Sequence, residues 1–341
     1  MTKVLLLLAV SLLSAACNGS DDKEISSMTP SKQLKTECVG RVLIDLPIGT
    51  ASWMQSHGYG EITKLEAASL EEFHHLVSAR KSTLQKAKHE KAGSMLVGYT
   101  EPTDSSAAMV LHTDPDVDIG PDLEEYLWLK KTAYKIRIRA LTENSLEYAS
   151  QFFPILSDFA PFPDDGGVPT APGFCIDRAL LIGRPIGEYG TRADYNVRPV
   201  KRPGLSIGLL VEENQGRLGG SAFDSLKTEE RAAQGRGGEL GLKQFKVLRK
   251  QNHNLDDFDG EETISLTELK NGTKLYSFRW RTLGQLKSIV HPHITITMDT
   301  DNPLRDGTYI KTPPEEEMIG LWDAVLDSLR HRPGALPPGA K

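Results

Sequence analysis

The chain has few of the features that mark nucleic-acid-binding or zinc-binding proteins. Its 341 residues include three cysteines, and its 40 basic residues are fewer than its 46 acidic ones. Because nucleic-acid binding depends on a clustered basic face that releases counterions, we expect no nucleic-acid partner. The cysteines are too far apart for a zinc site, and no other residues supply ligands at a suitable spacing. The sequence has no glycine-rich phosphate loop, so we also expect no cofactor.

Its composition is nevertheless that of a folded protein. Hydrophobic residues make up 39% of the chain and charged residues 25%, which is enough apolar surface to bury a core and excludes a wholly disordered chain. At roughly 150 residues per domain, two domains are expected.

The N-terminus has the pattern of an exported protein. A short basic start (residues 1–3) precedes an apolar run over residues 4–13, which is shorter than the roughly 20 residues needed to span a bilayer. Small residues at 14–16 lead into Cys17 and resemble the bacterial lipoprotein box, in which the cysteine carries the lipid. Asn18, in place of aspartate, favours the outer membrane by the same resemblance. The alternative is an ordinary signal peptide that happens to contain a cysteine.

We divide the chain by composition, because proline, glycine and aspartate concentrate near its middle. The expected parts are a signal peptide (1–16), a flexible tether (17–35), an N-terminal domain (36–162), a linker (163–173), a C-terminal domain (174–336) and a tail (337–341). A shared C-x-x-R-x-L frame begins at Cys38 and at Cys175, which suggests a distant duplication. In an oxidising periplasm these two cysteines are expected to form a disulfide. The alternative is two separately buried thiols.

The hydrophobic pattern predicts an α+β fold, with mixed antiparallel sheets and flanking helices in each half. Strands are expected at 38–44, 95–99, 107–112, 126–130, 134–141, 205–212, 245–250, 262–266, 274–279 and 293–298. Three helices are expected. The first is capped by Ser69, buries Phe73, Leu76, the stem of Arg80 and Leu84, and ends near residue 93; the second runs over 225–234. The third has an apolar stripe of Met318, Trp322, Val325 and Leu329, an acidic first turn (315–317) and a basic last turn (330–332). Residues 270–274 are expected to form a hairpin turn. A further helical face over 146–156 is interrupted by a proline.

One motif resembles a hydrolase site. Residues 204–208 match the G-x-S-x-G pattern, with Ser206 as the nucleophile. That motif needs a buried strand before the serine and a helix after it. Prolines precede Ser206 and an apolar run follows it, so an ordinary serine in a strand is the better interpretation.

Two further patterns suggest metal binding weakly. Residues 114–125, from Asp114 to Glu125, approximate a calcium loop, but Ile119 occupies the position that requires glycine, so we expect an acidic solvated loop. His291 and His293 lack a third ligand. His74 and His75 are neighbours on a helix and diverge, and the residues after His89 do not complete a zinc-protease motif.

Three segments are distinctive in combination: residues 37–47 (ECVGRVLIDLP), residues 260–262 leading to 276–280 (YSFRW), and residues 321–330 followed by 332–335. Together they resemble the periplasmic immunity proteins that protect bacteria against phospholipase effectors of the type VI secretion system. The resemblance covers about residues 35–335, with Val42 where the family often has an aromatic residue. These apolar, periodic segments are expected to maintain the fold.

The resemblance implies a two-domain α+β clamp that grips the lipase and blocks lipid access, with no chemistry of its own. The expected partner is therefore a secreted phospholipase effector, and the contact residues are not assigned. The membrane is expected to hold the protein through the lipid on Cys17. Two alternatives remain open: an envelope lipoprotein hydrolase that uses Ser206, and a structural envelope lipoprotein.

Overall fold

The computed structural model describes residues 34–57, 61–89, 93–101, 107–114, 117–129, 131–138, 159–163, 167–176, 179–182, 191–200, 204–213, 220–238, 241–300, 312–337 and 339. The signal peptide, Cys17, the tether up to residue 33 and the expected helix over 146–156 lie outside these residues. Among the described residues, no helix is both long and apolar enough to cross a membrane.

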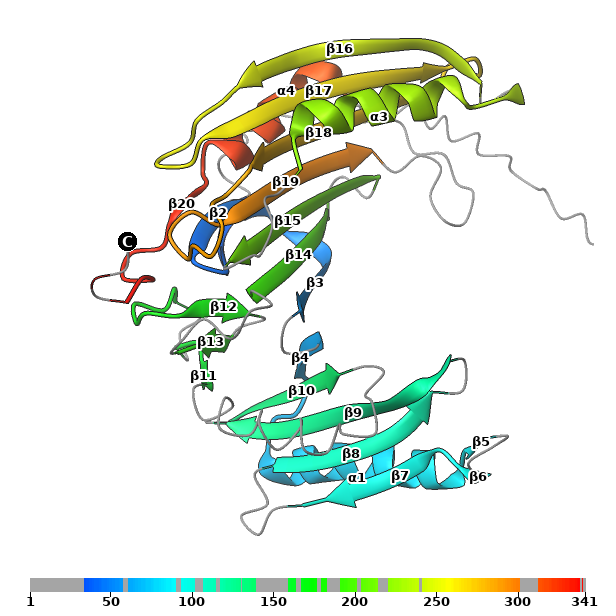
Figure 1. Cartoon of the computed structure of the whole chain (residues 1–341), viewed down its shortest axis with the longest axis vertical. Coiled ribbons are helices and arrows are strands. Elements are labelled where there is room, and N and C mark those ends of the chain that lie inside the picture. The colour runs from blue at the N-terminus through cyan, green and yellow to red at the C-terminus, as the bar shows by residue number, and fades with distance from the viewer. Residues whose placement is uncertain are drawn as a thin grey trace, which may run out of the picture.

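Two antiparallel sheets dominate the molecule (Figure 1). The larger one has the order β16-β17-β18-β19-β15-β14-β3, formed by Leu242–Asn252, Gly260–Leu269, Lys274–Thr282, His293–Thr300, Leu205–Glu213, Thr191–Pro199 and Gly49–His57. The smaller one has the order β4-β10-β9-β8-β7, formed by Glu61–Leu65, Thr132–Ile138, Val117–Leu129, Ala107–Asp114 and Leu96–Thr100. The α+β prediction is confirmed.

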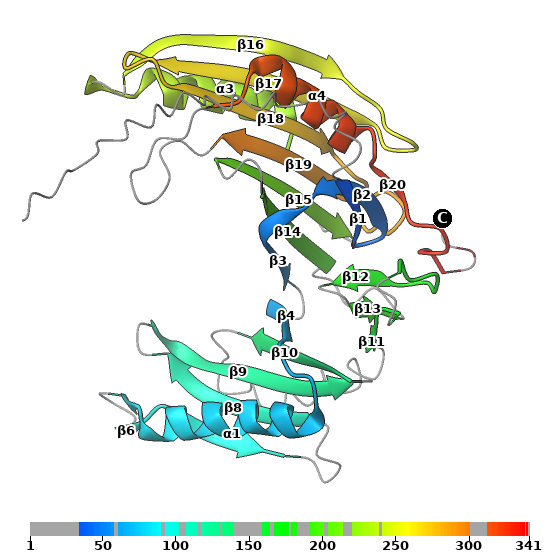
Figure 2. The same cartoon turned by 180° about the vertical axis from the view of Figure 1, so that it is seen from behind.

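The three described helices cover these sheets. Helix α1 (Leu70–Lys86) packs on the five-stranded sheet, whereas α3 (Ala222–Gln234) and α4 (Glu315–Leu326) lie on opposite faces of the seven-stranded sheet (Figures 1 and 2). Three small sheets complete the described part: β1 (Leu34–Val39), β2 (Val42–Pro47) and β20 (Arg330–His331); β11 (Phe159–Pro161), β13 (Ala179–Leu181) and β12 (Phe174–Ile176); and β5 (Lys88–His89) with β6 (Gly93–Ser94).

The sheets do not follow the order of the chain. Strand β3 pairs with β14, from Arg192 opposite His57 to Pro199 opposite Gly49, so an N-terminal strand forms an edge of the C-terminal sheet. The next strand, β4, pairs with β10 in the other sheet. Consecutive strands β3 and β4 therefore belong to different sheets (Figure 2). The expected N-terminal domain, 36–162, thus includes β3, whose pairing partner lies in the second half, and the β1–β2 hairpin, in which β2 also pairs with β20.

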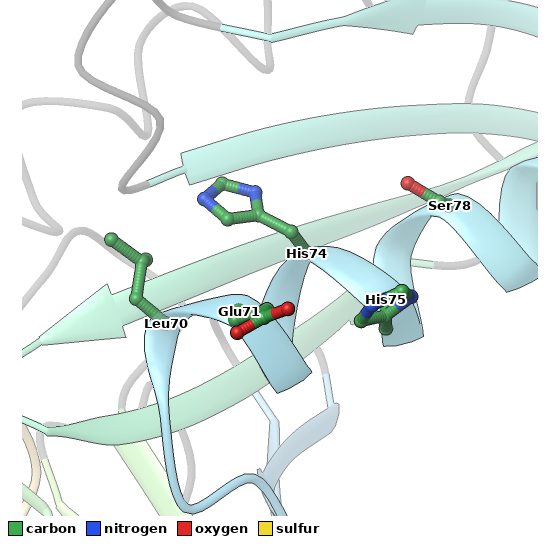
Figure 3. A pocket seen from close by; sticks show the side chains of 5 residues that line it. All are labelled: Leu70, Glu71, His74, His75 and Ser78. Carbon is green, nitrogen blue, oxygen red and sulfur yellow. The ribbon is translucent and has the colours of Figure 1, made fainter.

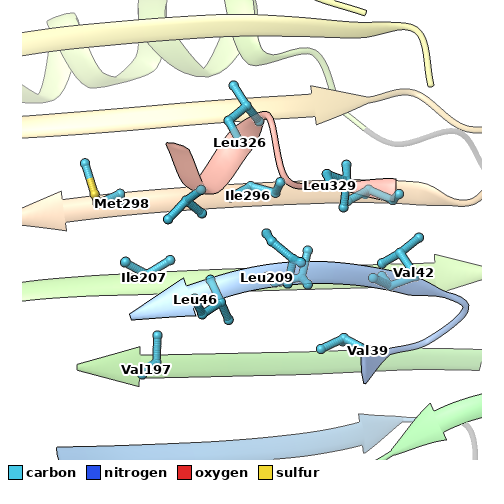
Figure 4. Packing of buried hydrophobic residues seen from close by; sticks show 14 of the residues in the cluster. Val39, Val42, Leu46, Val197, Ile207, Leu209, Ile296, Met298, Leu326 and Leu329 are labelled. Carbon is cyan, nitrogen blue, oxygen red and sulfur yellow. The ribbon is translucent and has the colours of Figure 1, made fainter. Parts of the chain in front are cut away.

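The main core is formed by strands along which buried side chains alternate with more exposed ones. Along β15 every second side chain is buried, beginning with Leu205, and the same alternation buries Tyr276, Phe278 and Trp280 on β18. Helix α4 and the β1–β2 hairpin cover this face, as Figure 4 shows for residues that include Val42, Leu46, Ile296, Leu326 and Leu329. A second cluster lies between α1 and the five-stranded sheet, and includes Phe73, Val77, Leu84, Val110 and Tyr126.

Three local predictions need correction. Residues 38–44 are not one strand, because Gly40 adopts a left-handed φ of +60° and the chain reverses between β1 and β2. In α1, Val77 rather than Leu76 joins the buried stripe: Leu76 is 40% exposed, since it lies at the margin of the face set by Phe73 and Leu84. The helix also ends at Lys86, before residue 93.

The C-terminal helix is shorter than its charge pattern suggests. It ends at Leu326, with Asp327 as the C-cap, and Arg330 and His331 form strand β20 instead of a last helical turn. Strand β20 pairs with β2, with Leu43 opposite Arg330. Pairing with a distant strand satisfies backbone groups that the helix would otherwise have used. The predicted turn at residues 270–274 is confirmed by the Leu269 N–H to Thr273 carbonyl bond of 2.9 Å.

Candidate functional site

Two of the three distinctive segments meet at one buried carboxylate. Glu262, on β17, is fully buried. Its Oε1 accepts hydrogen bonds from Trp322 Nε1 at 2.7 Å and from Arg249 Nη1 at 2.8 Å. Its Oε2 accepts from Gln251 Nε2 at 2.7 Å and lies 2.9 Å from His253 Nδ1. Burial opposes the charge, but these bonds outweigh it and lower the pKa of Glu262.

Trp280 and Gly260 make close contacts in the same region of the larger sheet. Trp280 is fully buried and donates its indole N–H to the carbonyl of His253 over 2.7 Å. Gly260 lies against this ring so closely that a Cβ there would stand 2.3 Å from Trp280. The YSFRW segment and the glycine that precedes Glu262 therefore hold β16, β17 and β18 together.

The first and last segments are joined by a buried arginine. Arg41, in the β1–β2 turn, places Nε 3.1 Å from the carboxylate of Glu213 and donates Nη1 to the carbonyl of Ala335 over 2.6 Å. Burial raises the pKa of Glu213 even though Arg41 and Arg332 oppose this. The N-terminal hairpin, β15 and the C-terminal segment are thereby fixed to one another.

A second buried arginine, Arg332, binds the backbone of the segment before β12. Arg332 donates to three backbone carbonyls, those of Pro169, Ala171 and Gly173, and its burial lowers its pKa to about 10. The structure also joins Cys38 to Cys175 by a disulfide with a Cα–Cα distance of 5.8 Å. Beside it, Gly40 and Cys175 exchange two backbone hydrogen bonds of 3.0 and 2.7 Å. The distinctive segments thus maintain the fold, as the sequence predicts.

Ser206 does not occupy a nucleophile elbow. It lies within β15, where its Cα partner on β19 is Asp299. The strand continues to Glu213, whereas an elbow requires a sharp turn into a helix directly after the serine. The prediction that Ser206 lies within a continuing strand is therefore confirmed.

The expected acidic loop over residues 114–125 is largely strand. Apart from residues 115–116, which are not described, it forms the β8–β9 hairpin, and Asp122, Glu124 and Glu125 are buried. Arg137 Nε donates to Asp122 over 2.9 Å. No group of three or more histidine, cysteine or acidic residues within the described ranges is arranged to hold a metal ion. The prediction of a solvated loop was wrong for residues 117–125, which belong to strand β9 and include the buried Asp122, Glu124 and Glu125.

A polar network beneath α1 was missed from the sequence. Arg80 donates to both oxygens of Glu124, each at 2.8 Å, and Tyr126 donates to Oε2 at 2.8 Å. His112 Nε2 lies 3.4 Å from Glu124 Oε1. Although burial opposes it, this set of bonds holds the pKa of Glu124 far below its usual range. The expected burial of the Arg80 stem was the available clue.

Glu125 differs sharply from its neighbour. It points to the opposite sheet face and is 1% exposed, and neither carboxylate oxygen has a hydrogen-bond partner among the described residues. Burial raises the pKa of Glu125 to about 7. It lies opposite Met109 and Ile136 on the neighbouring strands, so no cross-strand partner compensates its charge.

The histidine pairs belong to no cluster of three possible metal ligands within the described ranges. A shallow depression of about 510 Å³ on the outer face of α1 is lined by Leu70, Glu71, His74, His75 and Ser78. Figure 3 shows that the two imidazoles point in different directions, and His74 lies 3.7 Å from Glu101. His293 Nδ1 lies 2.7 Å from Glu212 Oε2. His89 falls in β5, and the residue after it is not described.

Comparisons with known proteins point to one family. The profile of the N-terminal domain of Tle cognate immunity protein 4 matches residues 35–154, and that of its C-terminal domain matches residues 167–334. No curated protein matches the sequence.

Solved structures share the fold. The apo structure of immunity protein TplEi of T6SS from Pseudomonas aeruginosa is 20% identical, with a TM-score of 0.66 over 89% of this chain and 98% of that one. TplEi complexed with an "L" peptide gives a TM-score of 0.64 at 20% identity, over 88% and 99%. The crystal structure of the Tle4–Tli4 complex gives 0.68 at 19% identity, over 89% and 99%.

Proposed function

Because the chain belongs to the Tle cognate immunity protein 4 family, we propose that it is an immunity protein that binds a phospholipase effector of the type VI secretion system and blocks its access to lipid. The observation that carries the proposal is the match of both domain profiles, which together cover nearly all of the chain after residue 34. The producing cell and its kin are protected in this way from hydrolysis of their membranes.

Inhibition by binding fits the chemistry of the described residues. The buried acidic groups are engaged in structural contacts, as in Glu262 with Trp322 and Glu124 with Arg80, or lie in apolar surroundings, as Glu125 does. Ser206 lacks the turn that exposes a nucleophile. We therefore propose that the protein acts as a binder and that it catalyses no reaction of its own.

The links between the sheets suit this role. An inhibitor that is ordered before it meets its target loses less conformational entropy on binding. Three contacts fix the β1–β2 hairpin and the C-terminal segment to the larger sheet. They are the disulfide, the Arg41–Glu213 pair and the hydrogen bonds from Arg332 to backbone carbonyls. This preorganisation supports a grip on the effector by a larger-sheet body whose surface is already in place.

We further propose that the mature chain is held at the outer membrane, facing the periplasm, through a lipid on Cys17. The apolar run, the small residues before Cys17 and Asn18 support this location. The disulfide is also consistent with an oxidising compartment. A phospholipase delivered to the periplasm would meet its inhibitor close to the membrane that it attacks.

Immunity is tested by directing the phospholipase encoded next to this protein's gene to the periplasm of a sensitive bacterium, with and without the chain. We expect rescue of growth and a stable complex of the two purified proteins. The Ser206→Ala variant is expected to rescue equally, since the serine is structural. Failure of the folded, expressed chain to bind and to rescue would refute the proposed function.

A further inference from the structure

A depression of about 340 Å³ lies between the first half of α3 and the strand face that α3 covers. We call it the α3 pocket. Its walls are polar and charged, and include Ser221, Asp224, Ser225, Glu229, Arg279 and Arg281. The two arginines alternate with Phe278 and Trp280 along β18, so they project to the side opposite the main core.

The acidic groups of the α3 pocket already have partners. Asp224 accepts from Lys227 Nζ over 2.9 Å on the exposed side of the helix. Glu229 lies 2.8 Å from Arg279 Nη1 and also accepts from the hydroxyls of Ser265 and Ser277. The Arg279–Glu229 pair therefore fastens α3 to the sheet, which leaves Arg281 as the remaining cation of the pocket.

Within the described part of the chain, the hydrogen-bond partner of Arg281 is neutral. Its Nη1 donates to the hydroxyl of Ser225 over 2.7 Å, and its buried Nε has no hydrogen-bond partner among the described residues. Glu261 is its cross-strand neighbour. That carboxylate instead accepts from the hydroxyl of Ser221 and the backbone N–H of Phe223, at the start of α3. Burial and the nearby Arg279 lower the pKa of Arg281, against the effect of Glu229, as expected for a guanidinium that lacks an anion.

We propose that the α3 pocket binds a carboxylate, namely an acidic side chain of the effector, which pairs with the guanidinium of Arg281. This inference rests on the proposed function. A guanidinium presents parallel N–H groups that match a carboxylate, and arginines in partly desolvated pockets often dominate binding energy at interfaces.

A protein carboxylate fits better than a lipid surface. Anionic membranes attract clusters of several basic side chains, whereas this pocket holds two arginines and two acidic residues and has one cation without an acidic partner among its described neighbours. A recessed site in which Arg281 forms no ion pair with a described residue suits a single acidic side chain inserted from a partner.

The test places a carboxylate of the protein itself beside Arg281. In Ser225→Asp a carboxylate replaces the hydroxyl to which Arg281 donates, so it competes with the effector for the guanidinium. The matched control is Ser225→Asn, which has the same shape without the charge. With the full chain and the full-length effector, calorimetry is expected to show affinity lower by roughly tenfold or more for Ser225→Asp, and near wild type for Ser225→Asn. Ser225→Asp is expected to keep or raise the melting temperature, which separates lost recognition from lost folding.

Arg281→Gln provides a second test, with Lys227→Gln on the exposed side of α3 as its control. We expect Arg281→Gln to weaken effector binding and Lys227→Gln to leave it unchanged. Equal affinities for Ser225→Asp and Ser225→Asn, with the wild-type chain binding tightly, overturn the α3 pocket and leave the immunity function intact. Effector binding unchanged in Arg281→Gln, together with loss of binding to phosphatidylglycerol vesicles, overturns the assignment to the effector. A wild-type chain that does not bind the effector contradicts the proposed function instead.

Discussion

Trp322 on α4 donates its indole N–H to Oε1 of Glu262 on β17 over 2.7 Å, across 60 residues of sequence. Both side chains are fully buried. The bond joins two of the three segments that distinguish this sequence, and it lies in the protein interior. Residues that identify the family can therefore serve the scaffold, while recognition is left to side chains on the surface.

Removing this donor should destabilise the protein. Trp322→Phe keeps an aromatic ring but removes one of the two donors to Oε1 of Glu262, and a hydrogen bond to a charged group contributes about 1.5–3 kcal/mol. Urea unfolding is expected to show a lower free energy of unfolding by that amount. The exposed Glu230→Gln is the control and should change it by less than about 0.5 kcal/mol. Equal stability of the two variants would contradict a structural role for the bond.

Glu125 should make the stability depend on pH. Burial raises its pKa from 4.5 to about 7, so in this range the folded chain keeps a proton that the unfolded chain releases. The free energy of unfolding therefore falls as pH rises between these values, by up to about 1.4 kcal/mol per pH unit, and the contribution is constant above them.

Glu125→Gln tests this assignment, because an amide does not ionise. Unfolding measured from pH 5 to pH 8 is expected to show a shallower decline for the variant, and greater stability than wild type at pH 8. The buried Glu213, whose pKa is also raised, is expected to supply part of the remaining slope. Identical slopes for the variant and the wild type would show that Glu125 does not hold its proton in the folded chain.

The disulfide should contribute strongly to stability. It joins residues 137 positions apart, and removal of a native disulfide typically costs about 2–5 kcal/mol. The Cys38→Ser, Cys175→Ser double variant is expected to unfold at a lower denaturant concentration, and a reductant should shift the wild type in the same direction. Mass spectrometry after alkylation gives the direct check: labelling of both cysteines in denatured, unreduced protein would rule the bond out.

Cys17 is expected to determine the location of the chain. Cys17→Ala removes the thiol that would be acylated, so the protein should leave the membrane fraction of fractionated cells. Immunity at low expression is then expected to weaken, since the inhibitor is no longer concentrated near the membrane. Asn18→Asp is the companion variant and should move the protein to the inner membrane. Unchanged outer-membrane association of Cys17→Ala would exclude the lipid anchor.

Local chemistry was sufficient to predict much of this protein from its sequence. The Ser69 cap begins α1 where expected, and its hydroxyl accepts from the N–H of Glu72. Trp322 is buried as its stripe predicts, and the turn at residues 270–274 connects two strands. Each feature depends on residues within a few positions of one another, where backbone preference and side-chain period act directly.

Only the tertiary structure decided the long-range features. The sequence does not show that β3 pairs with β14, because strand register depends on partners far along the chain. Nor does it distinguish Glu124, which pairs with Arg80, from Glu125, which has no hydrogen-bond partner among the described residues. It also does not show that Arg279 pairs with Glu229 whereas Arg281 donates to Ser225. The energy of a charged side chain depends on its desolvation and its neighbours, which are set only when distant segments pack together.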